Sequence, residues 1–290
     1  MELYSAFIEP FNEFGFMRRA LVACLALSIG CSGVGVLLIL RRMSLVGDAL
    51  SHAILPGAAV GFVVSGLSLV IMSLGGFIAG ILVAVLSGLV ARVTPQREDA
   101  SFAAFYLISL ALGVLIVSAR GSNVDLMHVL FGTILAVDDA SLLLVVSIAT
   151  LTLFVLAVLG RGLVVESFDP GFLRSVGGPG ARLHFVFLGL VVLNLVSGFH
   201  ALGTLMAIGL MMLPAAAARF WASQITTLYI VSSTIALTSG YAGLLLSYHF
   251  NLPSGPAIIL VVGSVYIISV VAGPRESILA CYLPGRHLEA

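Results

Sequence analysis

The chain has 290 residues, of which 60% are hydrophobic and only 9% are charged, and its formal net charge is zero. Soluble domains carry about 25% charged residues, so this composition predicts an all-α polytopic membrane protein surrounded by lipid. The balanced charge argues against a nucleic-acid partner.

All 13 basic residues are arginine, and the sequence contains no lysine. A Walker A loop needs its lysine, so the chain cannot hold an ordinary P-loop ATPase site. Motifs of zinc proteases, serine hydrolases and dinucleotide-binding enzymes are also absent. We therefore expect no enzyme activity and no cofactor of its own, and any ATP that drives the protein must bind a separate subunit.

Apolar runs of about 20 residues can cross a bilayer, and they follow a short N-terminal segment, residues 1–17. The whole chain, 1–290, is expected to form a single transmembrane domain. The span at 44–66 contains Pro56, and the span at 203–218 is short, so either is a candidate for a broken or partial helix, giving eight to nine transmembrane helices. The candidate spans are 20–40, 44–66, 70–91, 101–119, 140–160, 183–199, 203–218, 226–249 and 256–273.

Arginine placement predicts the orientation, because cytoplasmic loops are enriched in basic residues. With the loop at 161–182 in the cytoplasm, ten arginines lie on that side and three outside. Nine crossings would then put the N-terminus outside and the C-terminus inside. The cytoplasmic arginines are Arg41, Arg42, Arg92, Arg97, Arg161, Arg174, Arg182, Arg219, Arg275 and Arg286, and the outer ones are Arg18, Arg19 and Arg120.

Asp48 and His52 are four residues apart in the second span, which places both side chains on one face of a helix. His52 lies ten residues beyond Arg42, about 15 Å into the bilayer. Charged residues at this depth usually face a cavity or a ligand, and a carboxylate with an imidazole suits a divalent cation. A structural polar pair between helices is the alternative. Two ligands are too few for a metal site, so a second copy of the chain is expected to supply the others.

The polar segment at 161–182 contains a predicted short helix. Phe168-Asp169-Pro170 is typical of an N-cap followed by proline in the first turn, and Gly177 ends the helix. The segment is either an interfacial connector or a docking helix for a cytoplasmic subunit. His200 and His249 fall at the outer ends of their spans and are candidates for the ion path, with rim residues as the alternative. His184 gives no functional signal.

Five segments together resemble a known family. They occur in the order RRMSLVGDALSHAILPGAAVGF (41–62), LMHVLFGTILAV (126–137), SFDPGFLRSVG (167–177), GTLMAIGLMMLPAAAAR (203–219) and NLPSGPAIIL (251–260). They are similar to the membrane permeases of bacterial zinc, manganese and iron ABC importers, and the resemblance covers nearly the whole chain.

The resemblance implies a type II ABC importer-like permease in the bacterial cytoplasmic (inner) membrane, working as a homodimer. Its partners would be two cytoplasmic ATP-binding subunits and an extracytoplasmic metal-binding protein. Asp48 and His52 would belong to the metal path, and Phe168, Asp169, Pro170 and Gly177 to the ATPase-docking segment. Zinc is the favoured cargo, with manganese or iron as alternatives. The rival function is a proton-coupled secondary transporter of divalent metals.

Overall fold

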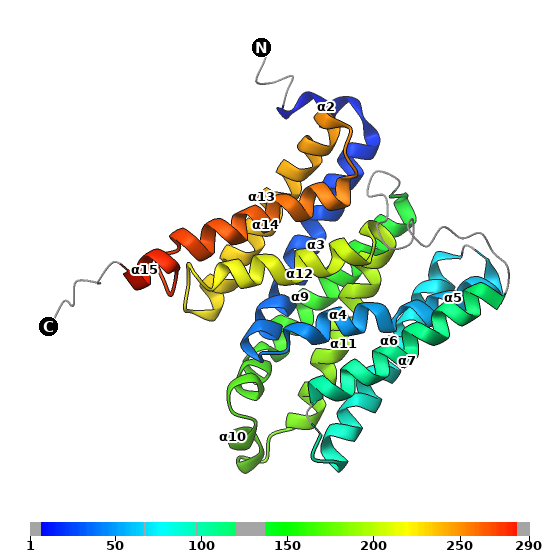
Figure 1. The fold of residues 1–290 in the computed structure, drawn as a ribbon, viewed down its shortest axis with the longest axis vertical. Helices are drawn as coiled ribbons and strands as arrows, with labels where there is room; N and C mark the ends of the chain where they lie inside the picture. Colours follow the sequence, from blue (N-terminus) through cyan, green and yellow to red (C-terminus); the bar gives the residue numbers. More distant parts are fainter. Residues whose placement is uncertain (1–6, 67, 97, 120–136, 283–290) are drawn as a thin grey trace, which may run out of the picture.

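The structure is a computed structural model that describes residues 7–66, 68–96, 98–119 and 137–282. These ranges contain α-helices and no strands, which confirms the predicted all-α fold (Figure 1). The helices are α2 (Glu9–Glu13), α3 (Gly15–Leu40), α4 (Ser44–Ala53), α5 (Leu55–Ser65), α6 (Leu69–Val93), α7 (Glu98–Ala119), α9 (Asp139–Phe168), α10 (Pro170–Ser175), α11 (Gly180–Leu202), α12 (Thr204–Ala218), α13 (Ile225–Phe250), α14 (Ser254–Ala272) and α15 (Ile278–Tyr282).

Each predicted span corresponds to a helix or a helix pair. Within the described ranges, eight segments are long and apolar enough to cross a membrane, and α4 and α5 together form one of them. The helix α12 has 15 residues, which gives a length of about 22 Å against a hydrocarbon core of about 30 Å. The expectation of eight to nine spans, with two irregular ones, is confirmed.

The second span is broken where the sequence places Pro56. Proline has no N–H, so the His52 carbonyl lacks the donor that the regular helix would supply four residues later. The helix α4 ends at Ala53, and α5 begins at Leu55 with proline in its first turn. The Ser109 hydroxyl of α7 donates to the Ala53 carbonyl at 3.1 Å. This bond from a neighbouring helix stabilises the break directly after the turn that carries His52.

Helix α3 lies at the centre of the bundle, and α9, α12 and α13 all pack against it. Small residues set the closest approaches. A side chain at Gly35 of α3 would run into the Met211 carbonyl of α12, and Gly57 of α5 lies directly against Gly75 of α6. Glycine at these points lets two helix backbones meet, as is common in membrane bundles.

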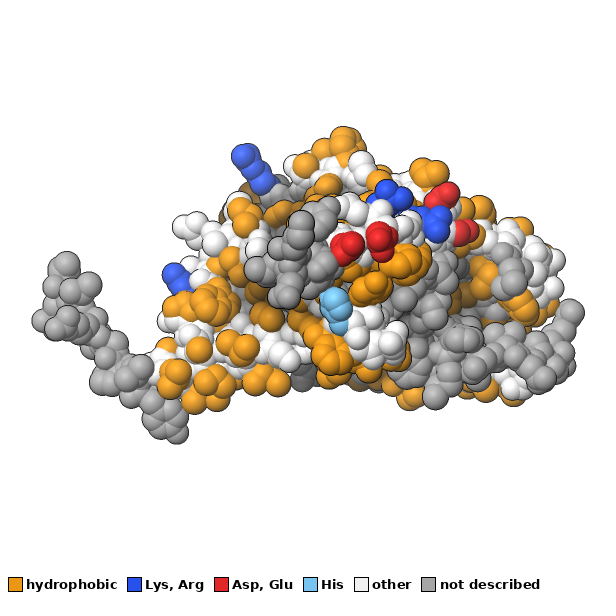
Figure 2. Space-filling view, turned by 90° about the horizontal axis from the view of Figure 1, so that it is seen from above, with side chains coloured by type: hydrophobic (Ala, Val, Ile, Leu, Met, Phe, Trp, Pro, Cys, Tyr) orange, Lys and Arg blue, Asp and Glu red, His pale blue; other side chains and the backbone are white. Residues whose placement is uncertain are grey.

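Polar contacts at the two ends show that α3 and α9 run in parallel. At one end Arg19 pairs with Asp139 at 3.2 Å, and at the other Arg41 bonds Ser167 at 2.9 Å. Helix α10 lies at the Arg41 end, at the bottom of Figure 1, whereas α2 is at the top. Seen from the α2 end, many of the drawn side chains are apolar, and acidic and basic side chains gather in one area (Figure 2). The Arg41 end is the one that the arginine count assigns to the cytoplasm.

Candidate metal site

Asp48 and His52 lie one turn apart on α4, as the spacing predicts. Asp48 Oδ1 is 3.8 Å from His52 Nε2, and their side chains are 56% and 28% exposed. The separation is too long for a direct hydrogen bond. Metal–ligand distances of about 2.0–2.2 Å allow two ligands of one ion to lie up to about 4.3 Å apart. The two atoms therefore lie within the reach of a single cation.

The pair faces away from the interior of its own protomer. Asp48 and His52 continue an outward stripe that begins at Leu45, which is 72% exposed, whereas Val46 and Leu50 on the other face are fully buried. The inner face of α4 packs against α7 and α11. Because the helix is held from behind, the carboxylate and the imidazole point towards whatever covers this face.

The fold leaves the polar groups of this pair incompletely satisfied. The Nδ1 atom of His52 is buried and has no hydrogen-bond partner among the described residues. The imidazole lies 6.1 Å from the Tyr106 ring of α7, measured between ring centroids. No third histidine, cysteine, aspartate or glutamate of the described residues joins the pair in a group that could hold a metal ion. The described part of one protomer thus offers two ligands and no complete site.

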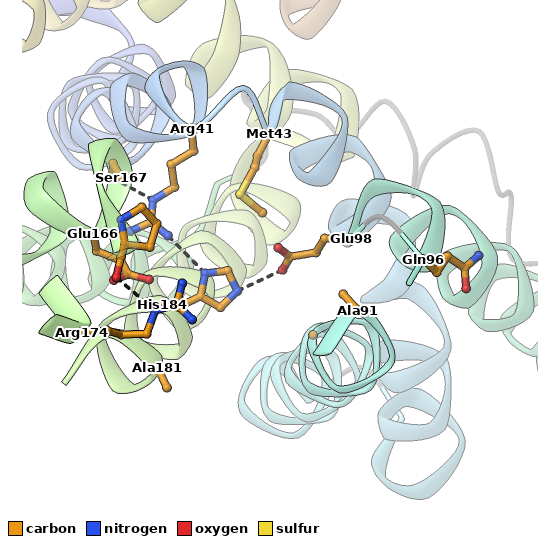
Figure 3. Close-up of a pocket in the computed structure, with 13 residues that line it drawn as sticks. Arg41, Met43, Ala91, Gln96, Glu98, Glu166, Ser167, Arg174, Ala181 and His184 are labelled. Atoms are coloured by element: carbon orange, nitrogen blue, oxygen red, sulfur yellow. Dashed lines mark hydrogen bonds and ion pairs between the residues drawn. The ribbon is translucent and has the colours of Figure 1, made fainter. Parts of the chain in front are cut away.

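A second polar cluster lies at the Arg41 end, and Figure 3 shows its side chains converging on a cavity of about 550 Å³. Arg41 donates from Nε to the Ser167 hydroxyl at 2.9 Å and faces His184 Nδ1 from Nη1 at 3.2 Å. His184 Nε2 lies 3.0 Å from Glu98 Oε1. The cluster joins the end of α3 to α7, α9 and α11. The Arg41 guanidinium also stacks on the Phe187 ring at 4.1 Å.

The charges of this cluster explain its arrangement. Burial lowers the pKa of Arg41, and the carboxylates of Glu166 and Glu98 partly offset that effect. Since an arginine can only donate, His184 Nδ1 must accept from it, and the ring hydrogen is then on Nε2, pointing at Glu98. The imidazole thus lies between the Arg41 guanidinium and the Glu98 carboxylate. The place of His184 in this cluster was not predicted from the sequence. A usable signal was present, because Arg41, Glu98 and His184 all fall at span ends assigned to one side.

The short helix at the end of α9 is built as its sequence predicts. Asp169 Oδ1 accepts from the Phe172 N–H at 2.8 Å, and Pro170 begins α10. Gly177 follows the helix with φ of +72°, a conformation that glycine adopts without strain. Helix α9 itself continues to Phe168, so the first part of the predicted 161–182 loop is helical.

Apolar side chains of this segment remain exposed to solvent. Phe168, Phe172 and Val176 are 63%, 57% and 65% exposed, whereas Leu173 packs against the core. We call these three residues the α10 apolar face. Leu173 thus attaches α10 to the bundle, and Phe172 of α10 and Phe168 at the end of α9 point outward at the end of the molecule.

The other predicted site residues do not join the pair. His249 is in the last turn of α13, beside the Tyr248 ring, and it is not grouped with Asp48 and His52. His200 lies near the end of α11, and the position of its side chain is not described. The motif at 126–137 falls, except for Val137, outside the described residues. A role for either histidine in the ion path stays a prediction.

Comparison with known proteins identifies the family. A family model described as the ABC 3 transport family matches residues 13–273. The chain belongs to this family. The manganese import system permease protein ScaB of Streptococcus parasanguinis is 31% identical over 274 residues, covering 94% of this chain and 96% of that protein. The chelated iron transport system membrane protein YfeD of Yersinia pestis is 29% identical over 269 residues, covering 93% and 89%.

A solved structure, PsaBC from Streptococcus pneumoniae in complex with Fab, has the same fold as this ABC-3 permease. The two chains are 30% identical and superpose with a TM-score of 0.84, covering 95% of this chain and 98% of that one. The resemblance, the ABC importer-like permease fold and the location in a bacterial cell membrane that the sequence predicts are therefore confirmed.

Proposed function

We propose that this permease imports a divalent metal ion as one half of a homodimer. The observation that carries the proposal is the outward-facing Asp48–His52 pair, held 3.8 Å apart on α4. A two-fold partner facing α4 would add the same pair. Two carboxylates and two imidazoles would then complete a four-coordinate site. The metal is the substrate, and it passes through this site by alternating access after an extracytoplasmic binding protein delivers it.

The preferred metal is a separate part of the proposal. Oxygen and imidazole ligands suit zinc, manganese and ferrous iron alike, so the ligand chemistry does not support the sequence-based preference for zinc. The relatives described above carry the names of manganese and iron systems. We therefore propose manganese as the main cargo, with ferrous iron and zinc as competitors.

The energy source would be ATP hydrolysed by a separate cytoplasmic subunit that docks on the α10 apolar face. The chain has no lysine and hence no Walker A loop of its own. The exposed Phe168, Phe172 and Val176 lie at the end assigned to the cytoplasm. Exposed aromatic clusters of this kind are typical of the central contacts in protein–protein interfaces.

Uptake by proteoliposomes that contain the permease, its ATPase and its binding protein tests the metal site. We expect radioactive manganese uptake to require ATP and to fall more than tenfold in Asp48→Asn and in His52→Gln. Asp139→Asn is the matched control, because Asp139 is 84% exposed and pairs only at the surface with Arg19. Normal uptake by both site variants would contradict the proposal. Uptake driven by a proton gradient without ATP would favour a secondary transporter. Parallel assays with zinc and ferrous iron rank the cargoes.

Binding of the ATPase tests the docking surface independently. Truncation of an anchor residue at the centre of an interface costs about 2–4 kcal/mol, so Phe172→Ala should weaken ATPase binding by roughly 30- to 1,000-fold. The matched control is Phe154→Ala, because Phe154 is 66% exposed but lies in the middle of α9. Equal ATPase affinities of the two variants, measured by titration of the detergent-solubilised permease, would remove α10 from the interface.

A further inference from the structure

A second hollow of about 540 Å³ lies on the side of the bundle, over α3. Helices α9 and α13 both pack against α3 but make few contacts with each other in the described residues. The hollow is the space between them. Its floor includes Gly33 and Leu37 of α3, and its walls include Leu156 and Gly160 of α9 and Tyr229 of α13. We call it the α3–α9–α13 groove. Its volume is in the range of pockets that hold small ligands.

The groove is apolar along most of its length and basic at one end. Its wall runs along α9 from Leu153 to Val164, a distance of about 16 Å, and Arg161 lies about one turn before the Val164 end. Arg161 is exposed and forms no ion pair with any described carboxylate. Thr226, in the first turn of α13, lines the same end. This is the end near Arg41, assigned to the cytoplasm, so the single cation lies at the level of the inner-leaflet headgroups and the apolar part points into the membrane.

We propose that the α3–α9–α13 groove binds an anionic phospholipid of the cytoplasmic leaflet. One acyl chain lies along Leu156 and Tyr229, and the headgroup phosphate pairs with Arg161. Three observations point to this occupant: the apolar lining, the one cation at the headgroup level, and the membrane location of the chain. Basic pockets between transmembrane helices on the cytoplasmic side are suited to such headgroups.

A second copy of the chain fits the groove less well than a lipid. A helix with its side chains is about 10–12 Å wide, whereas the groove is only the space between two helices that share a third. The surface that the second copy would cover is also a different one, because the Asp48–His52 stripe belongs to α4 and no residue of α4 lines the groove. The lipid site and the proposed metal site can therefore be occupied together.

A substitution at Gly160 can fill the groove without displacing neighbouring atoms. A Cβ built at Gly160 meets no atom within 4 Å, so Gly160→Leu places its side chain in the open groove without moving the helix. Gly263 of α14 has equally open space around it and does not line the groove, which makes Gly263→Leu the matched control. Arg161→Gln removes the headgroup contact, and Arg219→Gln, an exposed arginine paired with Glu276 at 4.0 Å, is its control.

The experiment is native mass spectrometry of the detergent-purified permease titrated with phosphatidylglycerol or phosphatidylcholine. We expect the parent protein to retain phosphatidylglycerol at least tenfold more tightly, and Arg161→Gln to remove that preference. Gly160→Leu should release one bound lipid of either kind, and both controls should behave as the parent. Unchanged phosphatidylglycerol binding in Arg161→Gln and Gly160→Leu would overturn the proposal. So would loss of dimer without loss of lipid in Gly160→Leu, because the groove would then be a protein interface.

Discussion

The Arg41 cluster makes a quantitative prediction about stability. In Arg41→Ala the hydrogen bonds to Ser167 and His184 and the stacking on Phe187 are lost together. Hydrogen bonds from a charged donor are worth about 1.5 kcal/mol each at the low end of their range, which suits a partly buried group. The stacking adds about 0.5–1 kcal/mol. Relief of the cost of burying the guanidinium reduces the sum, and we expect a net loss of about 2–3 kcal/mol.

The accessibility of the cysteine thiols can be used to measure this loss of stability. Cys24 and Cys31 are 1% exposed and Cys281 is exposed, so a Cys281→Ser background leaves two thiols that a maleimide reaches only when the bundle opens. A loss of 2–3 kcal/mol should accelerate labelling of these thiols by roughly 30- to 150-fold. The thiols of Arg41→Lys should be labelled at a rate between those of the parent and of Arg41→Ala, because an ammonium keeps the charge but lacks the planar set of donors of a guanidinium.

Arg42→Ala is the matched control for the loss of charge. Arg42 is the neighbouring residue, is exposed, and has a φ of +57°, and alanine pays a comparable conformational cost there. If Arg41→Ala were labelled no faster than Arg42→Ala, the cluster would contribute nothing beyond surface charge, and the magnitude worked out above would be wrong.

Further substitutions test the packing between the helices. Gly35→Ala pushes a methyl group into the Met211 backbone, so it should destabilise the permease by about 3 kcal/mol, the upper end of the usual cost of overpacking. Gly160→Ala has open space around its methyl group and should be neutral or stabilising. Equal melting temperatures of the two variants would contradict the close approach at Gly35. Asn194 donates to the Thr152 hydroxyl at 2.9 Å in the buried junction of α9 and α11. Hydrogen bonds between helices in membranes are worth about 0.6 kcal/mol on average. A double-mutant cycle of Asn194→Ala and Thr152→Val should therefore give a coupling free energy of about that size. A coupling of zero would remove that bond from the stability of the bundle.

The sequence predicted those features that depend on local chain chemistry. Pro56 cannot donate a hydrogen bond, so the break between α4 and α5 was expected in any bundle. The four-residue spacing places Asp48 and His52 on one face of a helix whatever surrounds it. The cap at Asp169 follows in the same way, because its side chain reaches a backbone N–H only three residues away. Each of these features is decided within one helical turn.

Features that depend on packing between distant segments were missed. Arg41, Glu98 and His184 are separated by 57 and 86 residues along the chain, and only the meeting of α3, α7 and α11 brings them together. No periodicity in the sequence predicts that these three helices pack together. The direction in which Asp48 and His52 face was equally inaccessible, because it depends on which side of α4 the other helices cover. A shared site was already expected from the sequence, because two ligands are too few for a metal site, and the structure adds the direction in which this pair faces.

The two kinds of residue differ in how the fold satisfies them. Arg41 and His184 find partners within the protomer, so they stabilise it and give no sign of function in the sequence. Asp48 and His52 are polar residues in an apolar span, and Phe172 is an apolar residue in a polar segment. The fold leaves Asp48 and Phe172 exposed and His52 only partly buried. An exposed carboxylate in an apolar span and exposed aromatic rings in a polar segment cost free energy when nothing covers them. In the proposed complex, a second copy that covers α4 and a cytoplasmic subunit that covers α10 would offset this cost.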